Sequence, residues 1–282
     1  FMMAMNISMA QKQKIILDTD IGGDIDDAFA VALALVSPEF EILGIVADHG
    51  NTPERAKIIC RMLYETGNED IPVVVGEKTS DYYGSQFHWT ENFDKLEPIE
   101  QSASDFIIEK LEQYPGEVIV FTVGPVTNMG NVVQKNPDAL KKAKKIYSMF
   151  GSFYMGYGRD PVPSAEWNVR ADAKASQLFT TAGADMVLAG LDVTTFVNLE
   201  EDRRRKLFRR QSPLTDALSG LYTLWGHETP TLFDPVALGM YLWPDLFQTR
   251  KAHIEVTDEG YTVINENKPP NAEIGMSINK NE

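Results

Sequence analysis

Five aspartates lie close together near the start of the sequence, and their side chains could hold a metal ion. The segment DTDIGGDIDD contains Asp18, Asp20, Asp24, Asp26 and Asp27. Crowding like charges costs free energy unless a cation compensates them. Carboxylate oxygens suit Ca²⁺ or Mg²⁺, whereas zinc sites use cysteine and histidine. Gly22 and Gly23 let the segment turn tightly enough for both flanks to converge, so we predict a site for a hard divalent cation.

The individual aspartates also have simpler structural interpretations. Asp26 or Asp27 could cap the helix that follows by accepting hydrogen bonds from its first free amides. Asp18 is better explained by hydrogen bonds to backbone amides that fix the loop than by metal ligation. Asp24 is better explained as a solvated loop residue. The cluster as a whole still predicts cation binding, because so many neighbouring carboxylates are costly without one.

Other polar groups follow predicted strands or begin predicted helices further along the chain. Asn51 ends the segment VADHGN, and the Val123 carbonyl precedes a turn in FTVGPVTN. Glu166 and Asn168 are two residues apart in PSAEWNVRAD, so in an extended segment their side chains point the same way. Asp234 lies at a helix start in LFDPVAL. Asn51 and Asp234 could instead be helix caps.

Apolar runs typical of buried strands alternate with helical patterns along most of the chain. The predicted strands cover residues 14–17, 41–47, 72–75, 118–123, 144–150 and 186–191, and the predicted helices 27–35, 52–66, 104–114, 128–134 and 172–182. This alternation predicts a single α/β domain with a largely parallel central sheet flanked by helices. Loops at the carboxyl ends of parallel strands bind ligands in such folds, and the polar groups above fall in those loops.

After residue 193 the pattern changes to helices at 202–211, 213–225 and 234–241, followed by β structure. HIEVTDEGYTVI predicts a hairpin with its turn at Asp258–Gly260, and AEIGMSIN predicts one more strand. A covering helix usually follows such a strand, so we expect the domain at residues 13–282 to lack its last helix. Residues 1–12 resemble a tail or the remnant of a secretory signal, which leaves cytoplasmic and periplasmic or secreted locations open.

The composition limits the partners that the protein can have. Its 26 basic and 41 acidic residues give a net charge of −15, which argues against nucleic acid, because phosphate binding needs a basic face. No stretch approaches the roughly 18 apolar residues of a membrane span. Cys60 is the single cysteine, so no internal disulfide can form. A neutral small molecule or a cation remains compatible with this charge.

Five segments together resemble one known family. DTDIGGDIDDAFA, ADHGN, TVGPVTN, AEWN and FDPVA, in that order, look like the nucleoside hydrolase family that prefers inosine and uridine. The resemblance runs from about Lys14 to Ile278, nearly the whole chain. It implies a Rossmann-related α/β fold and hydrolysis of the N-glycosidic bond of a ribonucleoside to ribose and free base. It also implies a homo-oligomer, a dimer or a tetramer.

The resemblance assigns roles to the polar groups. It implies a Ca²⁺ ion held by Asp20, Asp27, Asp234 and the Val123 carbonyl, with Asp20 also the general base for the attacking water. It implies that the ribose hydroxyls are held by Asp26, Asn51, Glu166 and Asn168. Cleaving the bond builds positive charge on the sugar, as in glycosidases. Carboxylates stabilise such charge, and a bound cation orients water and lowers its pKa.

Three features depart from the common pattern of that family. Phe233 stands where many members have a histidine that protonates the leaving base, and a phenyl ring can stack but cannot donate a proton. Asp160, which we expect to contact the substrate, stands where many members have an asparagine, and its carboxylate cannot donate a hydrogen bond as an amide does. The spacer containing Gly23 and Asp24 is longer than in the DTD-P-G-x-DD form.

The missing histidine leaves the acid that protonates the leaving base to be found elsewhere. His88 and His227 are the candidates that we expect to contact the substrate, with Tyr222 and Trp225 as possible stacking partners.

Two other interpretations remain open from the sequence. A phosphatase of the haloacid dehalogenase type also begins with a strand and DxD, but Ile21-Gly22-Gly23 fits its pattern poorly. A relative that binds a nucleoside or a sugar without turnover is the other, and Phe233 motivates it. Release of phosphate from a generic ester would identify the first, and binding without release of reducing sugar would identify the second.

Overall fold

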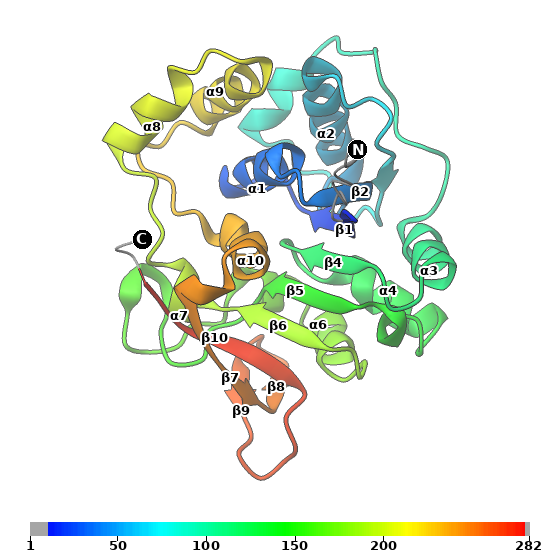
Figure 1. The fold of residues 1–282 in the computed structure, drawn as a ribbon, viewed down its shortest axis with the longest axis vertical. Helices are drawn as coiled ribbons and strands as arrows, with labels where there is room; N and C mark the ends of the chain where they lie inside the picture. The colour runs from blue at the N-terminus through cyan, green and yellow to red at the C-terminus, as the bar shows by residue number, and fades with distance from the viewer. Residues whose placement is uncertain (1–10, 280–282) are drawn as a thin grey trace, which may run out of the picture.

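One eight-stranded sheet forms the centre of the computed structural model, which describes residues 11–279 (Figure 1). Its strands, in chain order, are β1 (Gln13–Thr19), β2 (Phe40–Ala47), β3 (Val73–Val75), β4 (Ile119–Thr122), β5 (Lys145–Met149), β6 (Met186–Ala189), β7 (Phe247–Ala252) and β10 (Ala272–Ile278). In space they follow the order β3-β2-β1-β4-β5-β6-β10-β7. All neighbours are parallel except β10 and β7. The predicted single α/β domain with a largely parallel sheet is confirmed.

The antiparallel edge strand β7 was not among the predicted strands. Its sequence, FQTRKA, has only one fully buried residue, Ala252, so it lacks the apolar run that marks a central strand. The predicted hairpin is confirmed as a separate pair, β8 (Ile254–Val256) and β9 (Thr262–Ile264). Gly260 adopts a φ of +83° in its turn.

Helices cover both faces of the sheet (Figure 1). One face packs against α1 (Asp26–Val36), α2 (Thr52–Thr66), α9 (Pro213–Trp225) and α10 (Phe233–Leu242). The other face packs against α3 (Ala103–Gln113), α4 (Thr127–Lys135) and α6 (Ala173–Thr180). The shorter helices are α5 (Trp167–Ala171), α7 (Leu191–Thr194) and α8 (Glu201–Phe208), with 3₁₀ turns η1 (Ser85–Thr90), η2 (Leu140–Lys142), η3 (Tyr157–Arg159) and η4 (Pro244–Leu246).

Alternating side chains of the strands pack into two hydrophobic clusters, one on each face of the sheet. In β1, Ile15 and Leu17 join the cluster under α1 and α10, whereas Ile16 joins the cluster under α3 and α4. In β4, Phe121 and Val120 divide in the same way. This is the period of two that a strand imposes on its side chains. A strand buried on both faces reads as a continuous apolar run, which is why β1 was readily predicted.

The strand order places a topological switch point between β1 and β4. The chain moves from β1 outward to β2 and β3, and then returns to the other side of β1 with β4. Loops that leave the carboxyl ends of two such strands diverge and open a crevice between them. The aspartate segment leaves β1 and Val123 follows β4, so the fold brings both to this crevice.

Residues 1–10 of the expected N-terminal tail lie outside the described residues. Within residues 11–279, no helix combines the length and apolarity that crossing a membrane requires.

Candidate active site

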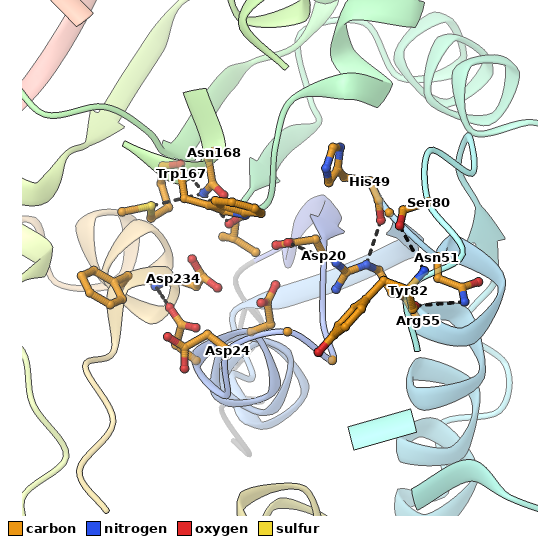
Figure 2. Close-up of a pocket in the computed structure, with 18 of the residues that line it drawn as sticks. Asp20, Asp24, His49, Asn51, Arg55, Ser80, Tyr82, Trp167, Asn168 and Asp234 are labelled. Carbon is orange, nitrogen blue, oxygen red and sulfur yellow. Dashed lines mark hydrogen bonds and ion pairs between the residues drawn. The ribbon is translucent and has the colours of Figure 1, made fainter. Parts of the chain in front are cut away.

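A cavity of about 680 Å³ opens at the carboxyl ends of the central strands (Figure 2). Ten of the residues singled out in the sequence line it: Asp20, Asp24, Asp26, Asp27, Asn51, Val123, Glu166, Asn168, Phe233 and Asp234. They come from loops after β1, β2 and β4 and from the starts of α1, α5 and α10. Residues separated by more than 200 positions in the chain therefore meet in one pocket, which is the size of a small-molecule site.

Three buried carboxylates converge at the base of this cavity. Carboxylate oxygens of Asp26, Asp27 and Asp234 lie within 4.8 Å of one another, and each residue is at most 4% exposed. Asp26 and Asp27 begin α1, and Asp234 is the second residue of α10. Neither helix is capped by these side chains, since Ile25 and Leu232 hold the cap positions. The cap interpretation of these three aspartates is therefore wrong.

Burial, together with repulsion from neighbouring carboxylates of the pocket, raises the pKa of all three carboxyls well above the usual range. Two neutralising influences partly offset this cost. The amino-terminal ends of α1 and α10 carry a positive partial charge from their helix dipoles. The Thr19 hydroxyl donates to Asp27 at 2.5 Å, and the Asp234 amide donates to Asp26 at 3.3 Å. Neither supplies a full positive charge, so the site suits a divalent cation, and its oxygen-only donors fit Ca²⁺ or Mg²⁺.

Asp20 lies beside this trio, and its carboxylate forms an ion pair with an arginine. Oδ2 of Asp20 is 3.5 Å from Nη2 of Arg55 on α2. Burial raises the pKa of Asp20, while the charges of Arg55 and His49 act in the opposite direction. Figure 2 shows Asp20 between Arg55 on one side and Asp234 on the other. Asp20 thus lies between the Arg55 guanidinium and the acidic trio.

Asp18 stands behind the cavity and does not line it. Its carboxylate accepts hydrogen bonds from Asn128 Nδ2 at 2.8 Å and from Thr122 Oγ1 at 3.2 Å. Burial raises the pKa of Asp18 to about 7. The expected role in fixing the loop agrees with this position, but the donors are side chains and not backbone amides. Asp18 therefore joins the ends of β1 and β4 to the start of α4.

Glu166 and Asn168 both line the cavity, although the extended segment expected for them is wrong. Glu166 is the amino-terminal cap of α5, and its carboxylate accepts from the backbone amides of Asn168, Val169 and Gly151. Burial raises its pKa to about 7. Asn168 Nδ2 donates to the Val123 carbonyl at 2.9 Å. This bond fixes the carbonyl that the sequence singled out, so the loop after β4 and α5 are held together.

Asn51 occupies the cap position of α2 but makes no capping hydrogen bond with its side chain. Its Nδ2 instead donates to the carbonyl of Tyr82 at 3.2 Å. The helix-cap interpretation of Asn51 is therefore wrong. The bond ties the loop after β2 to the segment from Glu77 to Pro98, which contributes Ser80 and Tyr82 to the cavity wall.

Three residues expected near the substrate lie outside the cavity lining. Asp160 is exposed and accepts a hydrogen bond from the Val162 amide at 2.9 Å. His88 is exposed and its Nδ1 is 2.6 Å from the Glu91 carboxylate, and exposed His227 packs its ring against Trp225. Among the residues that line the pocket, the one histidine is His49.

The cavity also contains residues that the sequence did not single out, above all Arg55, His49, Tyr157 and Trp167. His49 could have been found from the sequence, because it lies in ADHGN, one of the segments already considered. Its backbone is in the left-handed region, with φ of +52°. Nothing in the sequence marked Arg55 as a site residue, because it is one of several charged residues on α2. Only the fold shows that its side chain is largely buried.

Comparison with known proteins agrees with this pocket. The family model described as inosine-uridine preferring nucleoside hydrolase matches residues 15–282. Uridine nucleosidase 1 from Arabidopsis thaliana is 29% identical, over 90% of this chain and 81% of the relative. The pyrimidine-specific ribonucleoside hydrolase RihA from Citrobacter koseri is 27% identical over 94% of each chain.

Solved structures show the same fold. A plant nucleoside hydrolase, PpNRh1, is similar with a TM-score of 0.84 and 26% identity, and the match covers 96% of both chains. A purine-preferring ribonucleoside hydrolase from Gardnerella vaginalis has a TM-score of 0.80 at 22% identity, over 95% of this chain and 94% of the other. A match of this extent removes the phosphatase interpretation. The chain belongs to the inosine-uridine preferring nucleoside hydrolase family.

Proposed function

We propose that this protein is a Ca²⁺-dependent ribonucleoside hydrolase in which water displaces the base directly. As a member of its family the protein hydrolyses the N-glycosidic bond of ribonucleosides. The observation that carries the metal dependence is the convergence of Asp26, Asp27 and Asp234 within 4.8 Å. With the family's assignment added, Asp20, Asp27, Asp234 and the Val123 carbonyl would hold the ion. When bound, it would polarise a water and lower the pKa of that water.

The chain's own residues would perform the remaining steps. Asp20 would accept the proton of the attacking water. Asp26, Asn51, Glu166 and Asn168 would hold the ribose hydroxyls and so orient the anomeric carbon. Positive charge that develops on the sugar would be stabilised by the surrounding carboxylates. No residue needs to form a covalent bond to the sugar.

Departure of the base is the step for which the pocket offers least help. Of the four histidines, only His49 lines the cavity, and Phe233 takes the place expected for an acid. Uridine is the first natural substrate to test, because relatives with 27–30% identity are named uridine nucleosidase or pyrimidine-specific ribonucleoside hydrolase. The p-nitrophenyl riboside tests the water site alone, since its phenolate leaves without protonation.

The test is a panel of uridine, inosine and p-nitrophenyl riboside, assayed for reducing sugar with added calcium and with a chelator. We expect sugar release that the chelator abolishes. We also expect Asp234→Asn to lower calcium affinity and turnover by about a hundredfold or more, because a ligand is lost from a buried trio. Asp245→Asn, an exposed position in η4, is the matched control and should change neither.

Three other outcomes of this panel would contradict parts of the proposal. Undiminished activity in the chelator would exclude the metal dependence. Binding of nucleosides without sugar release from any riboside would favour the binding relative. Unchanged calcium affinity in Asp234→Asn would remove this residue from the ligand set.

We further propose that the protein is a homo-oligomer, a dimer or a tetramer, as its family resemblance implies. Size-exclusion chromatography with light scattering measures the mass directly. A mass of one chain at micromolar concentration would contradict this proposal.

A further inference from the structure

Arg55 is a largely buried arginine in the pocket wall, and each of its three nitrogens has an oxygen partner. Its Nη2 is 3.5 Å from Oδ2 of Asp20, and its side chain is 11% exposed. Nε donates to the His49 carbonyl and Nη1 donates to the Ile21 carbonyl, each at 2.8 Å. The guanidinium therefore joins the loop after β1 to the loop after β2. A planar fork can satisfy all three acceptors at once, which a lysine cannot do.

Glycines provide the space that this guanidinium occupies. A Cβ on Gly50 would lie 3.2 Å from Nη2 of Arg55, and one on Gly23 would lie 3.8 Å from Nη1. Gly50 also has a φ of +68°, which favours glycine. The Ile21 carbonyl belongs to the long spacer of the aspartate segment. The longer loop and the arginine thus form one local structure.

Asp20 is approached from its other side by the loop after β4. A Cβ on Gly124 would lie 2.9 Å from the Cβ, the backbone nitrogen and Oδ1 of Asp20. Oδ1 therefore faces the Val123–Gly124 backbone, while Oδ2 faces Arg55. The Asp20 carboxylate therefore lies between these two neighbours.

We propose that Arg55 is a positioning residue that withholds one oxygen of Asp20 from the metal ion. With Oδ2 paired to Arg55, Asp20 would offer Oδ1 to the ion and the attacking water. The positive charge of Arg55 also opposes the cation electrostatically. Arg55 would thereby have two effects. It would lower the affinity for the metal ion, and it would fix the orientation of the Asp20 carboxylate. This inference rests on the proposed cation site, but not on which riboside is cleaved.

The test compares Arg55→Met and Arg55→Lys with the wild type, using calorimetric titration of Ca²⁺ and separate kcat and KM values for p-nitrophenyl riboside. In Arg55→Met we expect calcium to bind about tenfold tighter, because a nearby positive charge is lost and Asp20 is free to turn. We expect kcat at saturating calcium to fall about tenfold to a hundredfold, with a smaller change in KM. Arg55→Lys keeps the charge, so its calcium affinity should stay near the wild type while kcat falls.

Arg61→Met is the matched control on the same helix. Arg61 bonds to the Trp89 carbonyl and packs on the Trp89 ring, away from the cavity. It should leave calcium affinity and kcat unchanged, which separates the local effect of Arg55 from a general loss of an arginine on α2. Thermal unfolding of each metal-free variant reports any change in folding.

Two results would overturn the inference. One is calcium affinity in Arg55→Met that equals or falls below the wild type. The other is a kcat at saturating calcium that does not change. If Arg55→Met does not fold, Arg55→Lys decides, because an unchanged kcat there overturns the inference and a reduced kcat with unchanged affinity supports it. A wild type that binds calcium but cleaves no riboside would refute the proposed function and leave the affinity comparison valid.

Discussion

Phe233 is the residue whose chemistry departs most clearly from what base departure requires. It begins α10 directly before Asp234, lines the cavity and meets the Tyr157 ring edge-on at 6.0 Å between centroids. An aromatic ring at this place can stack on a base, but it cannot protonate one. With phenylalanine at this position, the site can still bind a base although it protonates that base only weakly.

Replacing this ring by an imidazole tests whether protonation of the base is weak here. We expect Phe233→His to raise kcat/KM for inosine by about tenfold or more, because a positioned general acid contributes about 10²–10⁴ in rate. Hydrolysis of p-nitrophenyl riboside should change little, since its leaving group needs no proton. Phe233→Leu is the control for a mere change of shape. No gain with inosine would place the acid function at another residue.

Side-chain roles were only partly predictable from the sequence, and the reason differs between residues. The carboxylates were found because five of them in ten residues leave a signal in the composition of that segment. Arg55 left none, because its neighbours Glu54 and Lys57 on α2 are also charged and its burial depends partly on the distant loop that contains Ile21. His88 and His227, the candidates for the acid, lie outside the cavity lining. Their positions depend on the three-dimensional path of the chain, which the sequence pattern does not give.

At the scale of elements, the close packing of loops decides where the catalytic groups stand. Gly124 follows Val123 in the loop after β4, and its lack of a side chain lets this loop touch Asp20. We expect Gly124→Ala to displace Asp20 and to lower kcat by about tenfold or more, because displacements of about 1 Å at a reacting group are that costly. The variant should also lose about 1–3 kcal/mol of stability from overpacking.

Kinetics and chemical unfolding of this variant measure both effects. Gly239→Ala in α10 is the matched control, because its added Cβ would meet only ordinary contacts of 3.6 Å and beyond. Wild-type kcat in Gly124→Ala would show that the loop can move away without disturbing Asp20.

The elements with strong apolar periodicity were predicted well, and those defined by partners were not. β1 and α2 were expected at residues 14–17 and 52–66 and are found at Gln13–Thr19 and Thr52–Thr66. β7 was missed because an edge strand needs no apolar alternation, only the neighbouring β10 to pair with. α5 was missed because its start depends on the Glu166 carboxylate accepting amides of the next turn. Local pattern thus predicts buried elements, and tertiary contacts define the rest.

At the scale of the whole molecule, the buried carboxylates link stability to pH. Burial raises the pKa of Asp18 and of Glu166 to about 7 in the folded protein, and it raises those of Asp26, Asp27 and Asp234 well above the usual range. A raised folded-state pKa means that the native protein binds more protons than the unfolded chain. Their stabilising contribution is fully present below pH 4 and is lost as the pH rises through about 7 for Asp18 and Glu166.

We therefore expect the metal-free protein to melt at a lower temperature at pH 8 than at pH 5, after treatment with a chelator. Calcium should reverse this slope, because it binds the deprotonated carboxylates and so stabilises the native state most at high pH. Differential scanning calorimetry at both pH values, with and without calcium, measures the four melting temperatures. A metal-free protein that melts higher at pH 8 would contradict the burial of these charges.

The hydrogen bond from the Asp234 amide to Asp26 spans 208 positions of the chain. During synthesis, the ribosome must release almost all of the described domain before these two residues can meet. A cation at the proposed site would therefore lack Asp234 as a partner while the nascent polypeptide is still short. The complete set of carboxylates would form only after the two distant segments have docked.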